Sequence, residues 1–424
     1  MNQFDYNSEL KAQVLTAPAY QERCQVLFEL FKFSRQWDGN PQTLLALQAA
    51  LGELHIDWQK KKKEFKKEQN EIGLVVVKRL ILILRKIADA LVWRALNYDR
   101  VAIQLLAEHQ KTGHIDESVM IDFEIARQII EDSGALVLVN DLTSTLLHGD
   151  LTIIEPNRKI SIIENKSGKS SRRNSRAIRQ KKQLNDLIDF LNTGFRTSKE
   201  NTQDYILRAQ VEIETHHVII LDVVEQAKRK GYQKKILSDC FAIEAIWMAH
   251  SNAHMPSVRP FADVDHTISQ SNLVVFDETT RRIVPYSVFP FDDETCFALL
   301  TGELMLMATL NFDALKELYR KHGLTIELPN PTPEEIEAYL SASRGERMRS
   351  IKQDRSSWFV IRHRHDLMRV SPDYWGRILL EFIDENTVIQ ADLYSLQKIA
   401  DWEIPDNQTT RMYYGYMDET KVWK

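Results

Sequence analysis

The chain has 424 residues, of which 43% are hydrophobic and 27% charged, enough to form two or three structural units with substantial cores. The formal net charge of −5 excludes a polycation, so any nucleic-acid surface must be a local cluster of basic residues. The cysteines are far apart and odd in number, which excludes a disulfide framework and is typical of a protein from a reducing cytoplasm.

Two stretches bear on membrane targeting. The first ten residues, MNQFDYNSEL, lack the basic and apolar segments of a secretory signal. The most apolar segment, GLVVVKRLILIL at residues 73–84, is interrupted by Lys78 and Arg79 and is too short to span a bilayer. We therefore expect a cytoplasmic protein with no membrane partner.

Residues 1–72 have the pattern of a helical N-terminal region. Apolar residues recur at helical spacing in residues 20–33 and 43–58, which predicts two helices facing a core. Between these helices the sequence DGNP predicts a loop. The charged stretch at 59–71 predicts a solvated helix that continues into a long helical pattern over residues 73–109.

The middle of the chain, residues 73–255, alternates between helix and strand patterns. A helix predicted at 117–132 stops at Ser133 and Gly134. The elements predicted after it are strands at 135–147, 149–155 and 159–167, a helix at 178–194, a strand at 204–217, a helix at 218–231 and a strand at 234–248. This order predicts an α/β (α+β) fold in which helices flank a mixed sheet.

Residues 256–424 have weaker patterns and predict a C-terminal α+β region of unknown role. Residues 292–323 have the pattern of one or two helices, and a proline-rich break follows at 327–335. The strand patterns in this region lie at 271–277, 281–291, 356–370 and 387–393.

One predicted hairpin, HGDLTIIEPNRKISIIENKSGK at residues 148–169, carries charged residues at its open end. Side chains alternate along a strand, so Glu164 and Lys166 share one face. A three-residue loop at 156–158 would place Asp150 opposite Glu164. A loop of two or four residues without a bulge would send Asp150 to the other face.

These charged residues suggest a particular chemistry. Two carboxylates that face each other on adjacent strands repel unless a cation lies between them. Divalent ions such as Mg²⁺ prefer oxygen ligands and bind carboxylates together with water and substrate phosphates. A lysine beside such an ion can stabilise an attacking water or the charge that develops on a phosphate. Asp150, Glu164 and Lys166 therefore fit metal-assisted hydrolysis of a phosphodiester.

An aspartate followed, after a spacer, by Glu164-Asn165-Lys166 resembles the PD-(D/E)xK, or restriction-endonuclease-like, nuclease superfamily. The order of elements over roughly residues 73–250 is also similar, although only three or four residues carry the motif. The resemblance implies a restriction-endonuclease-like fold and cleavage of nucleic acid that depends on Mg²⁺ or Mn²⁺. It further implies that Asp150 and Glu164 bind the metal, that the Asn165 carbonyl is a third ligand, and that Lys166 positions or activates the water.

The sequence departs from the superfamily pattern at Gly149, where many members have proline. Many members also carry an acid on the preceding helix. Asp89 is the candidate for this additional acid because a lone carboxylate among apolar neighbours is costly, and an ion pair with Arg85 or Arg94 is the alternative. Candidate polar contacts from the following helix are Gln180 and Gln183.

A basic run follows the hairpin. Between residues 166 and 182 there are eight lysines or arginines and no acid. Its first part predicts a mobile loop, and arginine would add bidentate phosphate contacts; a solvated loop without such contacts is the alternative. The candidate nucleic-acid contacts are Lys169, Arg172, Arg173, Arg176, Arg179 and Lys182.

These features predict a metal-dependent nuclease with Mg²⁺ or Mn²⁺ as its cofactor, and the resemblance favours DNA over RNA as the expected substrate. The family resemblance suggests a bacterial or phage-related setting such as defence against foreign DNA. One alternative is an inactive nucleic-acid-binding scaffold with the same fold. A second alternative is an interaction subunit whose N-terminal helices bind a partner or another copy of the chain.

Overall fold

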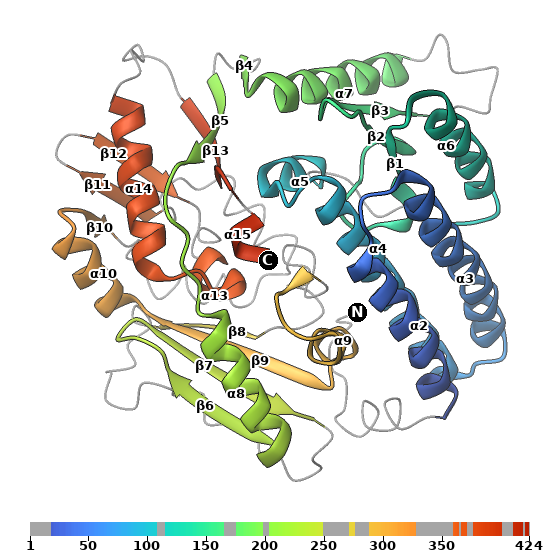
Figure 1. Ribbon diagram of the computed structural model, residues 1–424, viewed down its shortest axis with the longest axis horizontal. Helices are drawn as coiled ribbons and strands as arrows, with labels where there is room; N and C mark the ends of the chain where they lie inside the picture. Colours follow the sequence, from blue (N-terminus) through green and yellow to red (C-terminus); the bar gives the residue numbers. More distant parts are fainter. Residues whose placement is uncertain are drawn as a thin grey trace.

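The computed structural model of the chain describes residues 18–107, 115–164, 175–197, 203–248, 271–275, 288–327, 359–363, 366–370, 376–400, 410–418 and 420–423. The fold is mixed α/β, with helices around several small sheets (Figure 1). A bundle of helices with a three-stranded sheet lies on one side, and a four-stranded sheet with its own helices lies on the other (Figure 1). No helix within the described ranges is long and apolar enough to cross a membrane.

Five helices build the first side: α2 (Pro18–Gln36), α3 (Pro41–Lys67), α4 (Glu71–Ala95), α5 (Arg100–Leu106) and α6 (Val119–Ser133). Helix α4 lies at the centre, because it contacts both α2 and α3 and its second half is almost wholly buried. The boundary predicted between residues 72 and 73 falls within α4. The helices on either side of that boundary therefore share one core.

The predicted passage of α3 directly into α4 is wrong. The chain turns at Gln69, which has a φ of 56°. Asn70 then begins α4, since its side chain accepts a hydrogen bond from the Gly73 N–H. Asparagine is favoured at the N-terminal cap of a helix because its side-chain oxygen accepts from a backbone N–H that has no partner within the helix. Helix α4 ends at Ala95, and Asp99 caps the separate helix α5 in the same way.

A three-stranded antiparallel sheet, in the order β1-β2-β3, packs against α3 and α6. Its elements, with the helix that follows, are β1 (Leu136–Val139), β2 (Leu151–Ile154), β3 (Ile160–Ile163) and α7 (Ser175–Thr193). Gln48 of α3 donates to the Val137 carbonyl at 2.9 Å and accepts from the Val139 N–H at 2.8 Å. Asn192 of α7 bonds both backbone groups of Ile160 at 3.2 Å. Two side-chain amides thus satisfy groups that the edge strands leave unpaired.

The hairpin of β2 and β3 has the three-residue loop that places Asp150 level with Glu164. The Glu155 N–H donates to the Lys159 carbonyl at 3.0 Å, and the Arg158 N–H donates to the Glu155 carbonyl at 2.8 Å. Arg158 has a φ of 69°, as expected where a type I turn is followed by a left-handed residue. The register is fixed by this turn, with Leu151 paired to Ile163 at the other end.

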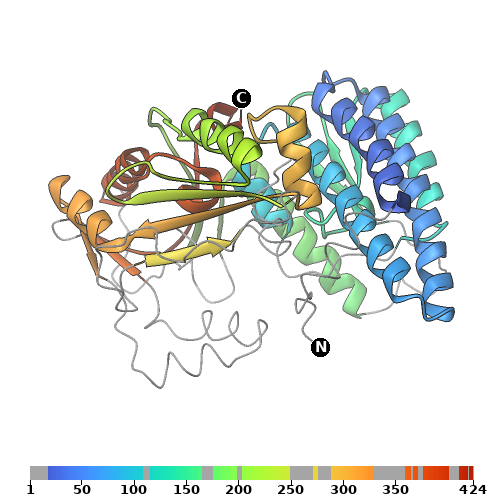
Figure 2. The ribbon, with the colours of Figure 1, turned by 90° about the horizontal axis from the view of Figure 1, so that it is seen from below.

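The other side contains a four-stranded antiparallel sheet in the order β6-β7-β9-β8, with α8 along one face (Figure 2). In a smaller sheet β13 pairs in parallel with β5. The elements are β4 (Phe195–Thr197), β5 (Gln203–Ala209), α8 (His217–Lys230), β6 (Tyr232–Ile236), β7 (Phe241–Trp247), β8 (Ser271–Val275), α9 (Asp293–Thr301), β9 (Leu304–Asn311), α10 (Phe312–Lys321), β10 (Thr325–Glu327), β11 (Phe359–His363), β12 (Asp366–Val370), α13 (Gly376–Glu381), α14 (Glu385–Ala400), β13 (Thr410–Tyr416) and α15 (Thr420–Trp423).

Three predictions for this side are wrong in detail. The strand predicted at 234–248 is two strands, because the Ser238 hydroxyl accepts the N–H groups of Cys240 and Phe241 and stabilises a turn. The helical pattern over 292–323 contains β9, whose Leu, Met and Ala residues favour helix but lie between two strands. The strand predicted at 387–393 lies within α14. Tertiary context overrides local propensity in the last two cases.

Buried or partly buried arginines join the two sides. Arg35 of α2 donates to the carbonyls of Phe289 and Phe291 at 3.1 and 2.6 Å. Arg100 of α5 pairs with the buried Glu381 of α13 at 2.7 Å, and Arg377 pairs with the same carboxylate from within α13, also at 2.7 Å. Removing one partner of such a group leaves an uncompensated buried charge. The contacts of Arg35 and Arg100 therefore fix the helical bundle against the side that holds the larger sheet.

Candidate active site

The two predicted acidic ligands lie at the same end of the hairpin. Asp150 directly precedes β2 and is half-buried, and Glu164 directly follows β3 and is exposed. The Asp150 N–H donates to the Ile163 carbonyl at 2.8 Å. The backbones of the two acids therefore flank the last pair of the ladder, which is formed by Leu151 and Ile163.

The backbone is irregular at Asp150. Its N–H bonds to β3, whereas its carbonyl accepts the Asn140 N–H at 2.9 Å on the β1 side. In a regular antiparallel strand both groups of one residue point the same way. A local bulge of this kind changes the direction of the side chain. Simple alternation therefore does not apply at Asp150, and the common face of the two carboxylates stays a prediction.

Gly149 has a structural reason to replace proline before the aspartate. Its φ is +66°, in the left-handed region, where a residue with a Cβ is strained. A Cβ at this position would lie 2.5 Å from the Ile162 side chain and 2.8 Å from the Ile163 carbonyl oxygen. Glycine thus lets the loop approach β3 closely enough to present Asp150.

Asp89, the candidate additional acid, anchors the loop between β1 and β2. Its buried carboxylate forms an ion pair, as the alternative proposed, but the partner is Lys86 at 2.8 Å in place of Arg85 or Arg94. It also accepts three hydrogen bonds from residues 144–145, at 2.5 to 3.1 Å. Both carboxylate oxygens are used in these contacts, which support a positioning role for Asp89 in place of metal binding.

Asn140 is a site residue that sequence reasoning missed. Its side-chain N–H groups donate to the His148 carbonyl at 2.6 Å and to the Gly149 carbonyl at 3.3 Å. Its Oδ1 is buried without a hydrogen-bond partner, and so is the hydroxyl of Thr152 on β2. A buried acceptor without a partner costs free energy. The available signal was a polar residue directly after the apolar strand LVLV.

The rest of the predicted site is placed only in part. The residues that lie outside the described ranges are Asn165, Lys166, Lys169, Arg172 and Arg173. Helix α7 contacts β3 and β4. The predicted site residues that lie within this helix are Arg176, Arg179, Gln180, Lys182 and Gln183. The side chain of Lys182 is exposed. The second half of the basic run is therefore carried by the helix that packs beside the hairpin.

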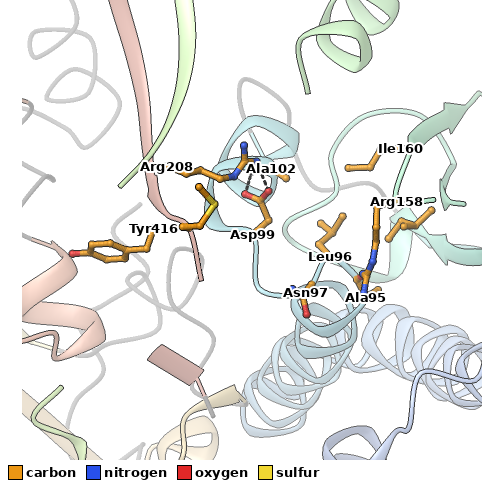
Figure 3. A pocket seen from close by; sticks show the side chains of 11 residues that line it. Ala95, Leu96, Asn97, Asp99, Ala102, Arg158, Ile160, Arg208 and Tyr416 are labelled. Atoms are coloured by element: carbon orange, nitrogen blue, oxygen red, sulfur yellow. Dashed lines mark hydrogen bonds and ion pairs between the residues drawn. The ribbon is translucent and has the colours of Figure 1, made fainter. Parts of the chain in front are cut away.

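A pocket of about 230 Å³ lies at the opposite, closed end of the hairpin. Figure 3 shows Arg158 on one wall and, on another, Arg208 bound to Asp99 at 2.5 Å. Arg158 also donates to the Ala95 carbonyl at 3.3 Å. Because a four-residue strand spans about 13 Å, this pocket is separate from the acidic end of the hairpin.

Comparisons of the chain with family models, with curated proteins and with solved structures gave no match. The interpretation of the hairpin therefore depends on the chemistry and geometry of its own residues. These features are two acids at the open end of one hairpin, a loop fixed by buried hydrogen bonds, and a buried amide oxygen without a hydrogen-bond partner.

Proposed function

We propose that the chain is a metal-dependent nuclease with a PD-(D/E)xK-like core. The observation that carries the proposal is the position of Asp150 and Glu164 at the open end of one hairpin of fixed register. The chain order α6, β1, β2, β3, α7, β4 is the order of elements that the motif implies, although β4 pairs with β5 in a separate sheet. DNA as the substrate and defence against foreign DNA as the setting are inferred from the resemblance alone.

The available donor atoms fit Mg²⁺ or Mn²⁺. Asp150 and Glu164 offer carboxylate oxygens, and Asn140 offers a buried amide oxygen without a partner among the described residues. The Asn165 carbonyl is the further ligand that the resemblance implies. Oxygen donors of this kind suit hard divalent ions. Such an ion, when bound, would neutralise charge on the phosphate and lower the pKa of a bound water.

In the proposed reaction a water attacks the phosphorus, and the bond from phosphorus to the leaving sugar oxygen breaks. Lys166 orients the water or stabilises the negative charge that develops on the phosphate. The contacts of Asp89 and Asn140 hold the loop before substrate binds, so Asp150 needs little ordering during the reaction. The basic run at 169–182 positions the phosphate backbone without reading its bases.

The experiment is a cleavage panel on the full chain. Single- and double-stranded DNA and RNA are incubated with Mg²⁺, Mn²⁺ or EDTA, and each substrate is also tested for binding. The variants are Asp150→Asn, Glu164→Gln and Lys166→Ala. Glu155→Gln is the matched control, because it removes an acid from the closed end of the same hairpin.

We expect Asp150→Asn and Glu164→Gln to lower the cleavage rate by roughly 10²–10³-fold or more and to weaken metal binding. Lys166→Ala should lower the rate while metal binding is retained, and Glu155→Gln should cut like the wild type. Wild-type cutting by all three site variants would place the site elsewhere. Binding without cutting by the wild type would favour the inactive scaffold.

A further inference from the structure

Three side chains from distant parts of the sequence converge on the side of the molecule away from the hairpin. His216 directly precedes α8, Asp384 directly precedes α14, and Glu385 is the first residue of α14. The Nε2 atom of His216 lies 3.0 Å from Oε2 of Glu385 and 3.7 Å from Oδ2 of Asp384. The three ligand atoms all lie within 4.8 Å of one another. His216 and Glu385 are buried and Asp384 is half-buried, so the cluster has one side toward solvent.

The backbone holds these residues together before any ligand binds. The His216 N–H donates to the Phe382 carbonyl at 2.8 Å, and the Asp384 N–H donates to the Glu214 carbonyl at 3.0 Å. The imidazole ring also stacks on Phe241, with 5.4 Å between ring centroids. A short antiparallel bridge and a ring contact therefore fix the imidazole against the start of α14.

Each carboxylate is also oriented from outside the cluster. The Ser238 hydroxyl donates to Oε1 of Glu385 at 2.5 Å. The backbone and side-chain N–H groups of Asn386 donate to Oδ1 of Asp384 at 2.8 and 3.1 Å. The second oxygen of each carboxylate is thereby turned toward the imidazole. Outer hydrogen bonds orient the ligands of metal sites in this manner.

We propose that His216, Asp384 and Glu385 bind a transition-metal dication of the Zn²⁺ type, with water as the fourth ligand. One imidazole and two carboxylates balance the charge of the ion, and the imidazole favours Zn²⁺ over Mg²⁺. A tetrahedral Zn²⁺ site with ordinary ligand distances has ligand–ligand separations of about 3.4 Å. The separations of 3.0 and 3.7 Å lie on either side of that value. This site is independent of the proposed nuclease function.

The test is a Zn²⁺ titration of the full chain by calorimetry, after removal of metals with a chelator. Every protein carries Glu164→Gln, so that the hairpin contributes little to binding. The variants are His216→Gln, Asp384→Asn and Ser238→Ala, and His363→Gln controls for loss of a histidine elsewhere. Asparagine caps a helix as well as aspartate does, so Asp384→Asn removes ligand charge without removing the cap. Circular dichroism checks that each variant is folded, and Co²⁺ replaces Zn²⁺ for absorption spectra.

We expect one Zn²⁺ per chain and visible Co²⁺ bands. His216→Gln and Asp384→Asn should weaken Zn²⁺ binding at least about 100-fold, and Ser238→Ala about tenfold, as loss of an orienting group does. His363→Gln should bind like the parent. Equal Zn²⁺ affinity in the parent and His216→Gln, or no Zn²⁺ binding by the folded parent, would overturn the proposal and leave an ion pair.

Discussion

The three-stranded and four-stranded sheets are assembled in different ways. In the first, β2 and β3 are joined by three residues and form an open-ended hairpin. In the second, β7 pairs with β9, so Phe241 lies opposite Leu310. The neighbouring sheet pairs β5 with β13 from near the end of the chain. The open end of the hairpin carries the two predicted acidic ligands, whereas β9 is buried between β7 and β8.

Buried polar groups also serve different purposes in the two regions. Around the hairpin, Asp89 and Asn140 form hydrogen bonds with the loop between β1 and β2, which leads directly to Asp150. Around the larger sheet, Glu381 and Glu385 bond to groups on other helices or helix starts. The first arrangement orders a site in advance, and the second joins elements that are distant in sequence. Variants in both regions can test this contrast.

The largest expected effect is the loss of the buried ion pair of α4. Asp89→Ala would leave the Lys86 ammonium buried without its carboxylate, which should lower the free energy of unfolding by about 3–5 kcal/mol. Urea denaturation measures this change. Glu117→Gln, which breaks an exposed pair with Lys60, is the control and should leave the midpoint unchanged. A loss below about 1 kcal/mol for Asp89→Ala would show that the loop anchor is not needed for folding.

A second variant tests the close approach of the loop to β3. Gly149→Ala combines a left-handed backbone with overlap at 2.5 Å from Ile162, so we expect a loss of about 3 kcal/mol. Gly134→Ala is the matched control, because its φ is also +66° but nothing lies within 4 Å of the added Cβ. That control should lose only about 1 kcal/mol. Equal losses in urea denaturation would remove steric overlap from the explanation.

The third prediction concerns pH and the larger sheet. Burial lowers the pKa of His217 to about 4, against about 6.5 in an unfolded chain. Between these values the unfolded chain binds a proton that the folded chain does not. Stability that is present above about pH 6.5 is therefore lost as the pH falls toward 4, by about 3 kcal/mol in total. The urea midpoint should fall between pH 7 and pH 4.5 in both proteins, and the fall should be smaller in His217→Gln than in the wild type. An equal fall of the midpoint in the two proteins would contradict the lowered pKa of His217.

The smallest effect is expected at the sheet edges. Gln48→Leu would leave the buried backbone groups of Val137 and Val139 without partners, which costs about 2 kcal/mol. Asn192 bonds the opposite edge but is exposed, so Asn192→Leu should cost only about 0.5 kcal/mol, because water replaces the amide. If chemical denaturation gave the reverse order, burial would not determine the strength of the two edge contacts.

The hairpin could be predicted because its determinants are local, namely alternating side chains and the turn sequence PNR. The bulge at Asp150 could not, since it depends on hydrogen bonds from Asn140 to residues 148–150 and on the close approach of Gly149 to β3. The sequence of β9 predicts helix because Leu, Met and Ala favour helices, and only its place between β7 and β8 makes it a strand. The cluster of His216 with Glu385 is invisible in sequence, because 168 residues separate its members along the chain.

The most direct test of the central claim is Mn²⁺ affinity, measured by the paramagnetic signal of the free ion in the His216→Gln background. The claim is that Asp150 and Glu164 hold one divalent ion together. We expect Asp150→Asn and Glu164→Gln each to weaken Mn²⁺ binding at least about tenfold, with Glu155→Gln unchanged. If the His216→Gln parent and its three variants all bind Mn²⁺ with the same affinity, Asp150 and Glu164 do not share a divalent ion.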